Sequence, residues 1–70
     1  MSAISVRRTI PVGRLDLFET IIVDGGEFVV EDTYRTFEHL FIYARDGENN
    51  RRSFLRMKDE HIEVKKRRRA

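Results

Sequence analysis

The 70-residue sequence contains no cysteine. Disulfide bonds and thiolate metal ligands are therefore excluded as means of stabilising so small a fold. Long apolar runs are also missing: nowhere do about 18 apolar residues follow one another, as a membrane-spanning helix requires. The N-terminal segment has no apolar stretch of signal-peptide length. We therefore expect a soluble intracellular protein, cytoplasmic or, in a eukaryotic cell, nuclear, with no membrane partner.

Signatures of catalysis and of cofactor binding are scarce. The two histidines, His39 and His61, do not have metal-ligand spacing. Gly25 and Gly26 are not followed by the longer glycine pattern and helix of a phosphate-binding loop. A chain of this length also provides little room for a cleft that excludes water. We expect no enzyme, no metal and no cofactor.

The length and the composition predict one small domain with a modest core. A chain of this size buries only about 60% of the surface that its unfolded form exposes. Hydrophobic residues make up 40% of the chain. Charged residues make up 37%, well above the roughly 25% of charged residues in ordinary domains. We expect residues 1–64 to form the domain and residues 65–70 a basic tail. A protein partner or a second copy could complete the small core.

The net charge of +2 is unevenly distributed. Residues 1–14 hold three basic residues and no acid, residues 15–50 hold two basic and nine acidic residues, and residues 51–70 hold nine basic and three acidic residues. A chain that is acidic in the middle and basic at both ends is typical of proteins with nucleic-acid or other charged partners. The alternative is that opposite charges face one another across neighbouring strands.

The clearest structural signal lies in residues 17–31, where two β-branched runs flank Asp24, Gly25 and Gly26. This pattern predicts a β-hairpin with a tight turn. If Gly25-Gly26 is the loop, Ile21 lies opposite Val30. One face of the hairpin then carries the candidate core residues Leu17, Ile21, Val23, Phe28 and Val30.

Further strands are indicated along the rest of the chain. A second hairpin is predicted around the polar segment Asp46 to Asn50, and a last strand from His61 to Lys66. A first strand from Ile4 to Ile10 would end at Pro11. These elements predict a mainly β fold: a small antiparallel meander, as a curled sheet or a small barrel.

An α+β fold, with one or two helices packed on a hairpin sheet, is the alternative. Residues 33–45 begin with possible helix caps and place apolar side chains on a helical stripe. Residues 50–66 show a weaker stripe of the same kind. Periodicity alone does not separate helix from strand in these two segments.

The candidate binding chemistry lies in the C-terminal third. If residues 51–58 form a strand, alternation turns Arg52, Phe54 and Arg56 outward, and Ser53 and Leu55 inward. An aromatic ring among cations is typical of proteins that bind single-stranded nucleic acid. Alternatively, Phe54 turns inward and the arginines form an ordinary solvated face. The predicted nucleic-acid-binding residues are Arg51, Arg52, Phe54, Arg56, Lys58, Lys65, Lys66, Arg67, Arg68 and Arg69.

Two functional hypotheses follow. The first is a small regulatory protein that binds DNA or RNA through the strand around Phe54, assisted by the basic C-terminal residues as a phosphate-seeking arm. The second is a small protein-binding adaptor or inhibitor whose acidic middle docks on a basic partner. Exposed edge strands would also allow association with a second copy.

Overall fold

The computed structural model describes the backbone of residues 4–68 and the side chains of residues 7–65. This part of the chain forms six strands and a single 3-10 turn. In chain order the elements are β1 (Ile4–Pro11), η1 (Val12–Arg14), β2 (Thr20–Val23), β3 (Gly26–Arg35), β4 (His39–Asp46), β5 (Arg51–Met57) and β6 (His61–Arg68). The predicted mainly β fold is confirmed.

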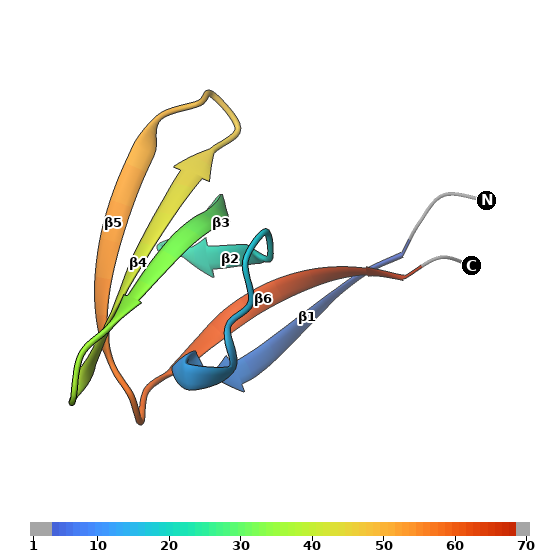
Figure 1. The fold of residues 1–70 in the computed structure, drawn as a ribbon. Coiled ribbons are helices and arrows are strands. Elements are labelled where there is room, and N and C mark those ends of the chain that lie inside the picture. Colours follow the sequence, from blue (N-terminus) through green and yellow to red (C-terminus); the bar gives the residue numbers. More distant parts are fainter. Residues whose placement is uncertain (1–3, 69–70) are drawn as a thin grey trace.

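The strands form one antiparallel sheet in the order β1-β6-β2-β3-β4-β5. The segment from β2 to β5 is a meander, after which β6 returns to pair with β2 and carries β1 on its other side. The sheet is open, with β1 and β5 as its edges. Figure 1 shows that it is strongly curled, so that β3, β4 and β5 cross the direction of β1 and β6. Of the two predicted architectures, the curled sheet is the one observed.

The predicted helices are absent from the described residues, and the α+β alternative is wrong. Within residues 33–45, burial alternates along β4: Leu40, Ile42 and Ala44 are buried, whereas Tyr43 is exposed. A period of two fits a half-buried strand. The helical stripe is interrupted at Thr36, whose N–H donates to the carbonyl of His39 at 2.9 Å and whose Oγ1 accepts from the His39 N–H at 3.0 Å. These bonds close the turn between β3 and β4.

The core lies on one side of the curled sheet, which we call the inner face; the opposite side is the outer face. Val12 from η1 joins it, and its N–H donates to the carbonyl of Glu60 at 2.9 Å. Leu17 was predicted to be buried but is half exposed, because it lies in the loop before β2. The buried residues are Val12, Ile21, Phe28, Val30, Leu40, Ile42, Ala44, Ile62 and Val64.

The first hairpin forms as predicted, but with a different register. Ile21 pairs with Phe28 rather than with Val30, because the two-residue loop is Asp24-Gly25 rather than Gly25-Gly26. Both loop residues have positive φ, 51° at Asp24 and 78° at Gly25. A type I′ turn requires this at both central positions, and Asp-Gly is among its preferred pairs. The residues predicted to share the core face still share it. The observed partner of Ile21 differs from the predicted one by two residues, and a shift of two residues keeps side chains on the same face.

Candidate nucleic-acid interface

The inner and outer faces of β5 are the reverse of the prediction. Phe54 lies opposite the buried Ile42 of β4, and directly paired residues of antiparallel strands share a face. Phe54 is therefore half-buried against the core, with its ring edge-to-face to Phe28 at 5.1 Å between centroids. Ser53 and Leu55 are on the outer face and exposed. Phe54 is thus not a free platform for nucleic-acid bases.

The two arginines beside Phe54 cover rings of the core. The Cζ atom of Arg56 lies 5.8 Å from the centroid of the Phe54 ring, and that of Arg52 lies 5.7 Å from the centroid of Phe28. Such cation–π contacts, together with the aliphatic stems of the arginines, shield the rim of the core where the sheet ends. These two cations therefore have a structural role at the open edge.

The remaining predicted residues around β5 lie elsewhere. Arg51 is on the outer face, with its Nε 3.7 Å from a carboxylate oxygen of Glu31. Lys58 follows the strand, and its Nζ lies 5.4 Å from the centroid of the exposed Phe37 ring. The cations of this region are thus spread over both faces and the end of β5. The structure does not assemble them into one patch.

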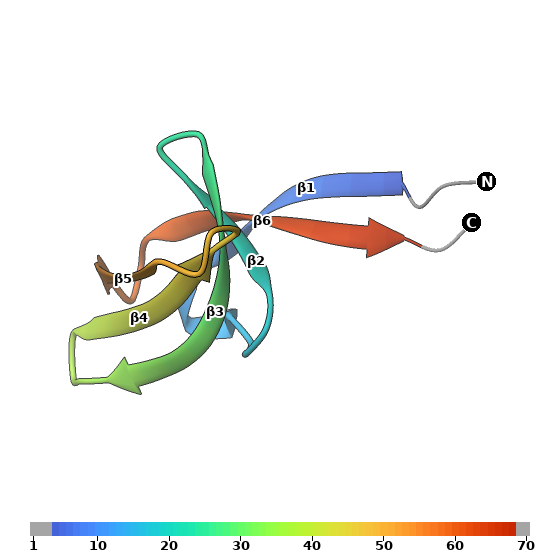
Figure 2. The same ribbon diagram turned by 90° about the horizontal axis from the view of Figure 1, so that it is seen from above.

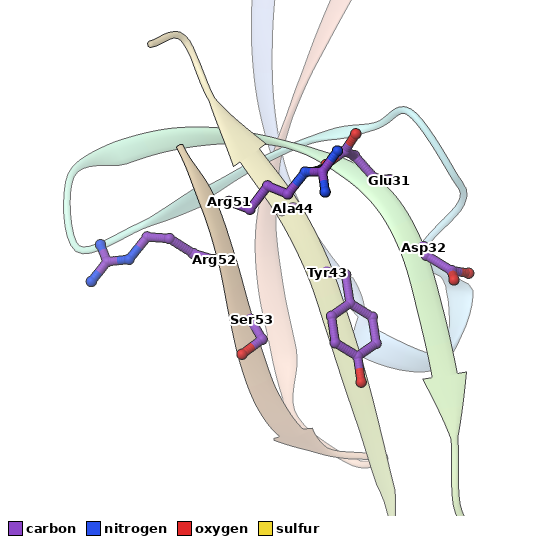
Figure 3. Close-up of a pocket in the computed structure, with 7 residues that line it drawn as sticks. All are labelled: Glu31, Asp32, Tyr43, Ala44, Arg51, Arg52 and Ser53. Atoms are coloured by element: carbon purple, nitrogen blue, oxygen red, sulfur yellow. Dashed lines mark ion pairs between the residues drawn. The ribbon is translucent and has the colours of Figure 1, made fainter. Parts of the chain in front are cut away.

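A shallow groove on the outer face lies beside β5 (Figure 3). Figure 3 shows Arg51 reaching toward Glu31 while Arg52 points away on the other side of the strand. Glu31 occupies an irregularity of β3, because the register with β4 shifts between Val30 and Asp32. The groove places two carboxylates beside its arginines, so its charge is mixed and it is a poor phosphate site. Its lining residues are Glu31, Asp32, Tyr43, Ala44, Arg51, Arg52 and Ser53.

The structure unites the two basic ends of the chain. β1 and β6 pair antiparallel from Ile4 opposite Arg68 to Pro11 opposite His61. We call residues 4–8 of β1 and residues 64–68 of β6 the basic ribbon. It contains no acidic residue. Its six cations are Arg7, Arg8, Lys65, Lys66, Arg67 and Arg68.

The basic ribbon projects from the rest of the sheet. β2 pairs with β6 only at residues 63–65, so residues 66–68 pair with β1 alone in the described structure. Figures 1 and 2 show β1 and β6 running side by side away from the other strands. Arg7 and Arg8 are exposed. The Nζ of Lys65 is bound to Glu27 of β3 at 3.0 Å, which anchors the base of the ribbon to the body.

The predicted site residues therefore fall into two groups near opposite edges of the sheet. One group surrounds the edge strand β5, and the other lies in β6, next to the edge strand β1. The backbone of residues 65–68, predicted to be a tail, is part of β6, which extends beyond the predicted end at Lys66. Arg69 lies outside the described residues. Arg7 and Arg8 were absent from the predicted site, although the excess of positive charge in residues 1–14 was a signal for them.

No helix in the described part of the chain is long and apolar enough to cross a membrane. Within the same residues, no group of three or more histidine, aspartate or glutamate side chains is arranged to hold a metal ion. No protein-family model, curated protein or solved structure matches this chain.

Proposed function

We propose that this protein binds nucleic acid through the basic ribbon and acts as a small regulatory protein. The observation that carries the proposal is the register of β1 and β6, which brings Arg7 and Arg8 beside the basic segment 65–68. Cations from the two ends of the chain thereby lie on one two-stranded element, with Arg7 and Arg8 on opposite faces of it. Each cation that neutralises a phosphate releases condensed counterions, and this release drives binding.

Arg7 and Arg8 of the ribbon are exposed, and no acidic residue of the ribbon lies beside them. Around β5, Arg51 faces Glu31, and Arg52 and Arg56 lie over aromatic rings. In the ribbon, Lys65 is likewise paired with Glu27, whereas no ion pair compensates the exposed Arg7 and Arg8 in the described structure. Uncompensated charge on an exposed element is the electrostatic footprint expected of a phosphate-binding surface.

Pairing within the sheet also favours the ribbon over a flexible tail. A flexible tail loses backbone entropy when it binds, at a cost of about 1–2 kcal/mol for each residue that becomes ordered. The backbone of residues 64–68 is already ordered by its pairing with β1. Its cations are therefore presented with less of the ordering cost that reduces affinity.

The test compares two double variants that remove the same charge. Arg7→Ala with Arg8→Ala alters the ribbon, whereas Arg14→Ala with Arg35→Ala removes two exposed arginines elsewhere. The ribbon variant should bind nucleic acid more weakly, and the slope of log K against log salt on duplex DNA should fall by about 0.9 for each phosphate that is no longer neutralised. The control variant should retain affinity and slope. Equal losses in both variants would show attraction by net charge alone and would refute a ribbon site.

One observation favours the adaptor hypothesis as a second candidate. The outer face of β3, β4 and β5 exposes an apolar patch next to the acidic residues Glu31 and Asp32, a combination that suits a basic amphipathic partner. A peptide of alternating lysine and leucine is a suitable probe. Shifts of backbone amide resonances confined to this patch would support the candidate, and the absence of shifts would reject it. The exposed residues of the patch are Tyr34, Tyr43, Leu55 and Met57, and the half-buried Phe41 lies beside Tyr34 and Leu55.

A further inference from the structure

We propose that the ligand of the basic ribbon is B-form duplex DNA and that the ribbon binds in its major groove. This inference rests on the proposed function and names its ligand class. It follows from three properties of the ribbon: its shape, the distribution of charge between its two strands, and its lack of aromatic residues.

The shape of the ribbon matches one groove and not the others. Two paired strands lie about 4.8 Å apart, and their side chains add to this width. The major groove of B-form DNA, about 12 Å wide, admits a two-stranded ribbon without deformation, whereas the minor groove, about 6 Å wide, would have to be opened by bending the duplex. The major groove of A-form RNA is deep and narrow. Beyond residue 65 of β6 no third strand in the described structure widens the ribbon, so its outer half has the dimensions that the groove requires.

The charge lies on both strands of the ribbon. β1 contributes Arg7 and Arg8, and β6 contributes the cations of residues 65–68. The major groove has a phosphate backbone along each of its two walls. A ribbon lying in the groove with cations on both strands can contact both walls, whereas a single basic segment would follow one backbone. The two-sided charge therefore fits a duplex better than a single strand.

The ribbon contains no aromatic residue in either strand. Proteins that bind single strands gain about 1–3 kcal/mol for each base that stacks on an aromatic ring. Phe54, the predicted platform, is packed against Phe28, and the exposed Tyr43 lies in the groove beside Glu31 and Asp32, whose charges repel phosphate. One exposed ring, Phe18, shares a hollow with Lys65 of the ribbon, but the same hollow holds the carboxylates of Asp16, Glu19 and Glu27, whose charges repel phosphate.

Fluorescence anisotropy with three ligands of one sequence tests the inference: duplex DNA, duplex RNA and single-stranded DNA. We expect the full chain to bind duplex DNA at least about tenfold more tightly than either other ligand. Methylation of guanine N7, which blocks the major groove, should weaken binding. Netropsin, which occupies the minor groove, should not compete. The Arg7→Ala, Arg8→Ala variant should lose the preference for duplex DNA, and the Arg14→Ala, Arg35→Ala control should keep it.

The possible failures are distinguishable. Similar affinity for duplex RNA or single strands, or competition by netropsin, would overturn the major-groove assignment and leave nucleic-acid binding in place. Equal affinity of the ribbon and control variants for all three ligands would remove the ribbon from the site. If the full chain bound none of the three at low salt, the proposed function itself would be wrong.

Discussion

At the scale of single residues, Phe54 shows how a side chain predicted for binding became part of the core. Its ring packs edge-to-face on Phe28, and the guanidinium of Arg56 lies over it. Complete removal of a buried phenylalanine costs about 3–5 kcal/mol, and a half-buried ring contributes a smaller share of this. Because the ring is half-buried, its removal should lower the stability of the fold rather than weaken the binding of nucleic acid.

Phe54→Ala should lower the free energy of unfolding by about 2–3 kcal/mol, because it leaves a gap beside Phe28. Leu55→Ala is the matched control, since Leu55 is the next residue of β5 but lies half exposed on the outer face; its cost should stay below about 1 kcal/mol. Urea unfolding followed by circular dichroism measures both. Equal stability of the two variants would contradict the inward orientation of Phe54.

The carboxylate of Asp46 makes the free energy of unfolding depend on pH. Its Oδ1 accepts the backbone N–H groups of Asn50 at 2.8 Å and of Glu48 at 2.9 Å, which closes the turn between β4 and β5. The hydrogen bond from the Asn50 N–H is the main cause that holds the pKa of Asp46 below its ordinary value of 3.8. A pKa lowered by folding means that the carboxylate stabilises the folded state. This contribution is complete above the ordinary pKa and is lost as the pH falls through the folded pKa.

The wild type should therefore be more stable than Asp46→Asn near neutral pH, and the difference in unfolding free energy should narrow below the ordinary pKa. Unfolding measured for both proteins across this range tests the prediction. Other carboxylates titrate in both proteins and cancel in the difference. A difference that does not change with pH would show that the charge of Asp46 does not stabilise the turn.

At the scale of elements, the first hairpin depends on the backbone of its two loop residues. Gly25 has a φ of 78°, and in this left-handed region a side chain is strained even though open space surrounds the residue. Gly25→Ala should therefore cost about 1 kcal/mol of stability. Gly13→Ala is the control, because its site is equally open and has no positive φ. Equal thermal unfolding temperatures for the two variants would contradict the Asp24-Gly25 turn.

The edge strand β5 is protected against pairing with a second copy. Antiparallel pairing of two β5 strands centred on Phe54 would place Arg52 of one copy opposite Arg56 of the other. Like charges in directly opposite positions are destabilising, and charged side chains on edge strands oppose aggregation. A homo-oligomer of this protein, which stays a prediction, would therefore need a surface other than this edge.

At the scale of the whole molecule, the basic ribbon exists only because the two ends of the chain pair. Because the chain has no native cysteine, an engineered disulfide reports this pairing directly. Ser5 lies opposite Arg67 in the register, and paired residues of neighbouring strands have the spacing that a disulfide needs. The double variant Ser5→Cys, Arg67→Cys should form an intramolecular disulfide on oxidation.

In the chain-entropy account, closing a loop of nearly the whole chain adds roughly 4 kcal/mol of stability. Mass spectrometry under non-reducing conditions detects the bond, and urea unfolding measures its effect. Ser5→Cys with Ser53→Cys is the control, because Ser53 lies on β5, at the opposite edge of the sheet. Failure of the Ser5–Arg67 pair to cross-link, or equally efficient cross-linking of the control, would contradict the β1–β6 pairing.

Local sequence was sufficient to predict the first hairpin and the positions of the turns, but it did not separate strand from helix in residues 33–45 and 50–66. β-Branched runs mark β2 and β3, the segment Asp24-Gly25-Gly26 marks the first turn without fixing which two of its residues form the loop, and the polar segment 46–50 marks the second turn. The start of β1 at Ile4 and of β6 at His61 also matched the prediction. These features depend on the backbone preferences of neighbouring residues and on short-range hydrogen bonds. They can be predicted without knowing where the rest of the chain lies.

The faces, the register and the site were decided by tertiary structure. Phe54 and Leu55 are both large and apolar, and only pairing of Phe54 with Ile42 selects which of them packs on the core. Arg7 and the segment 65–68 lie near opposite ends of the sequence, so no local pattern connects them. Their union depends on β6 returning to pair with β2 and then accepting β1 on its other side. The order of charged residues along the sequence determined that the chain would have basic ends, but long-range strand pairing determined that these ends form one ribbon.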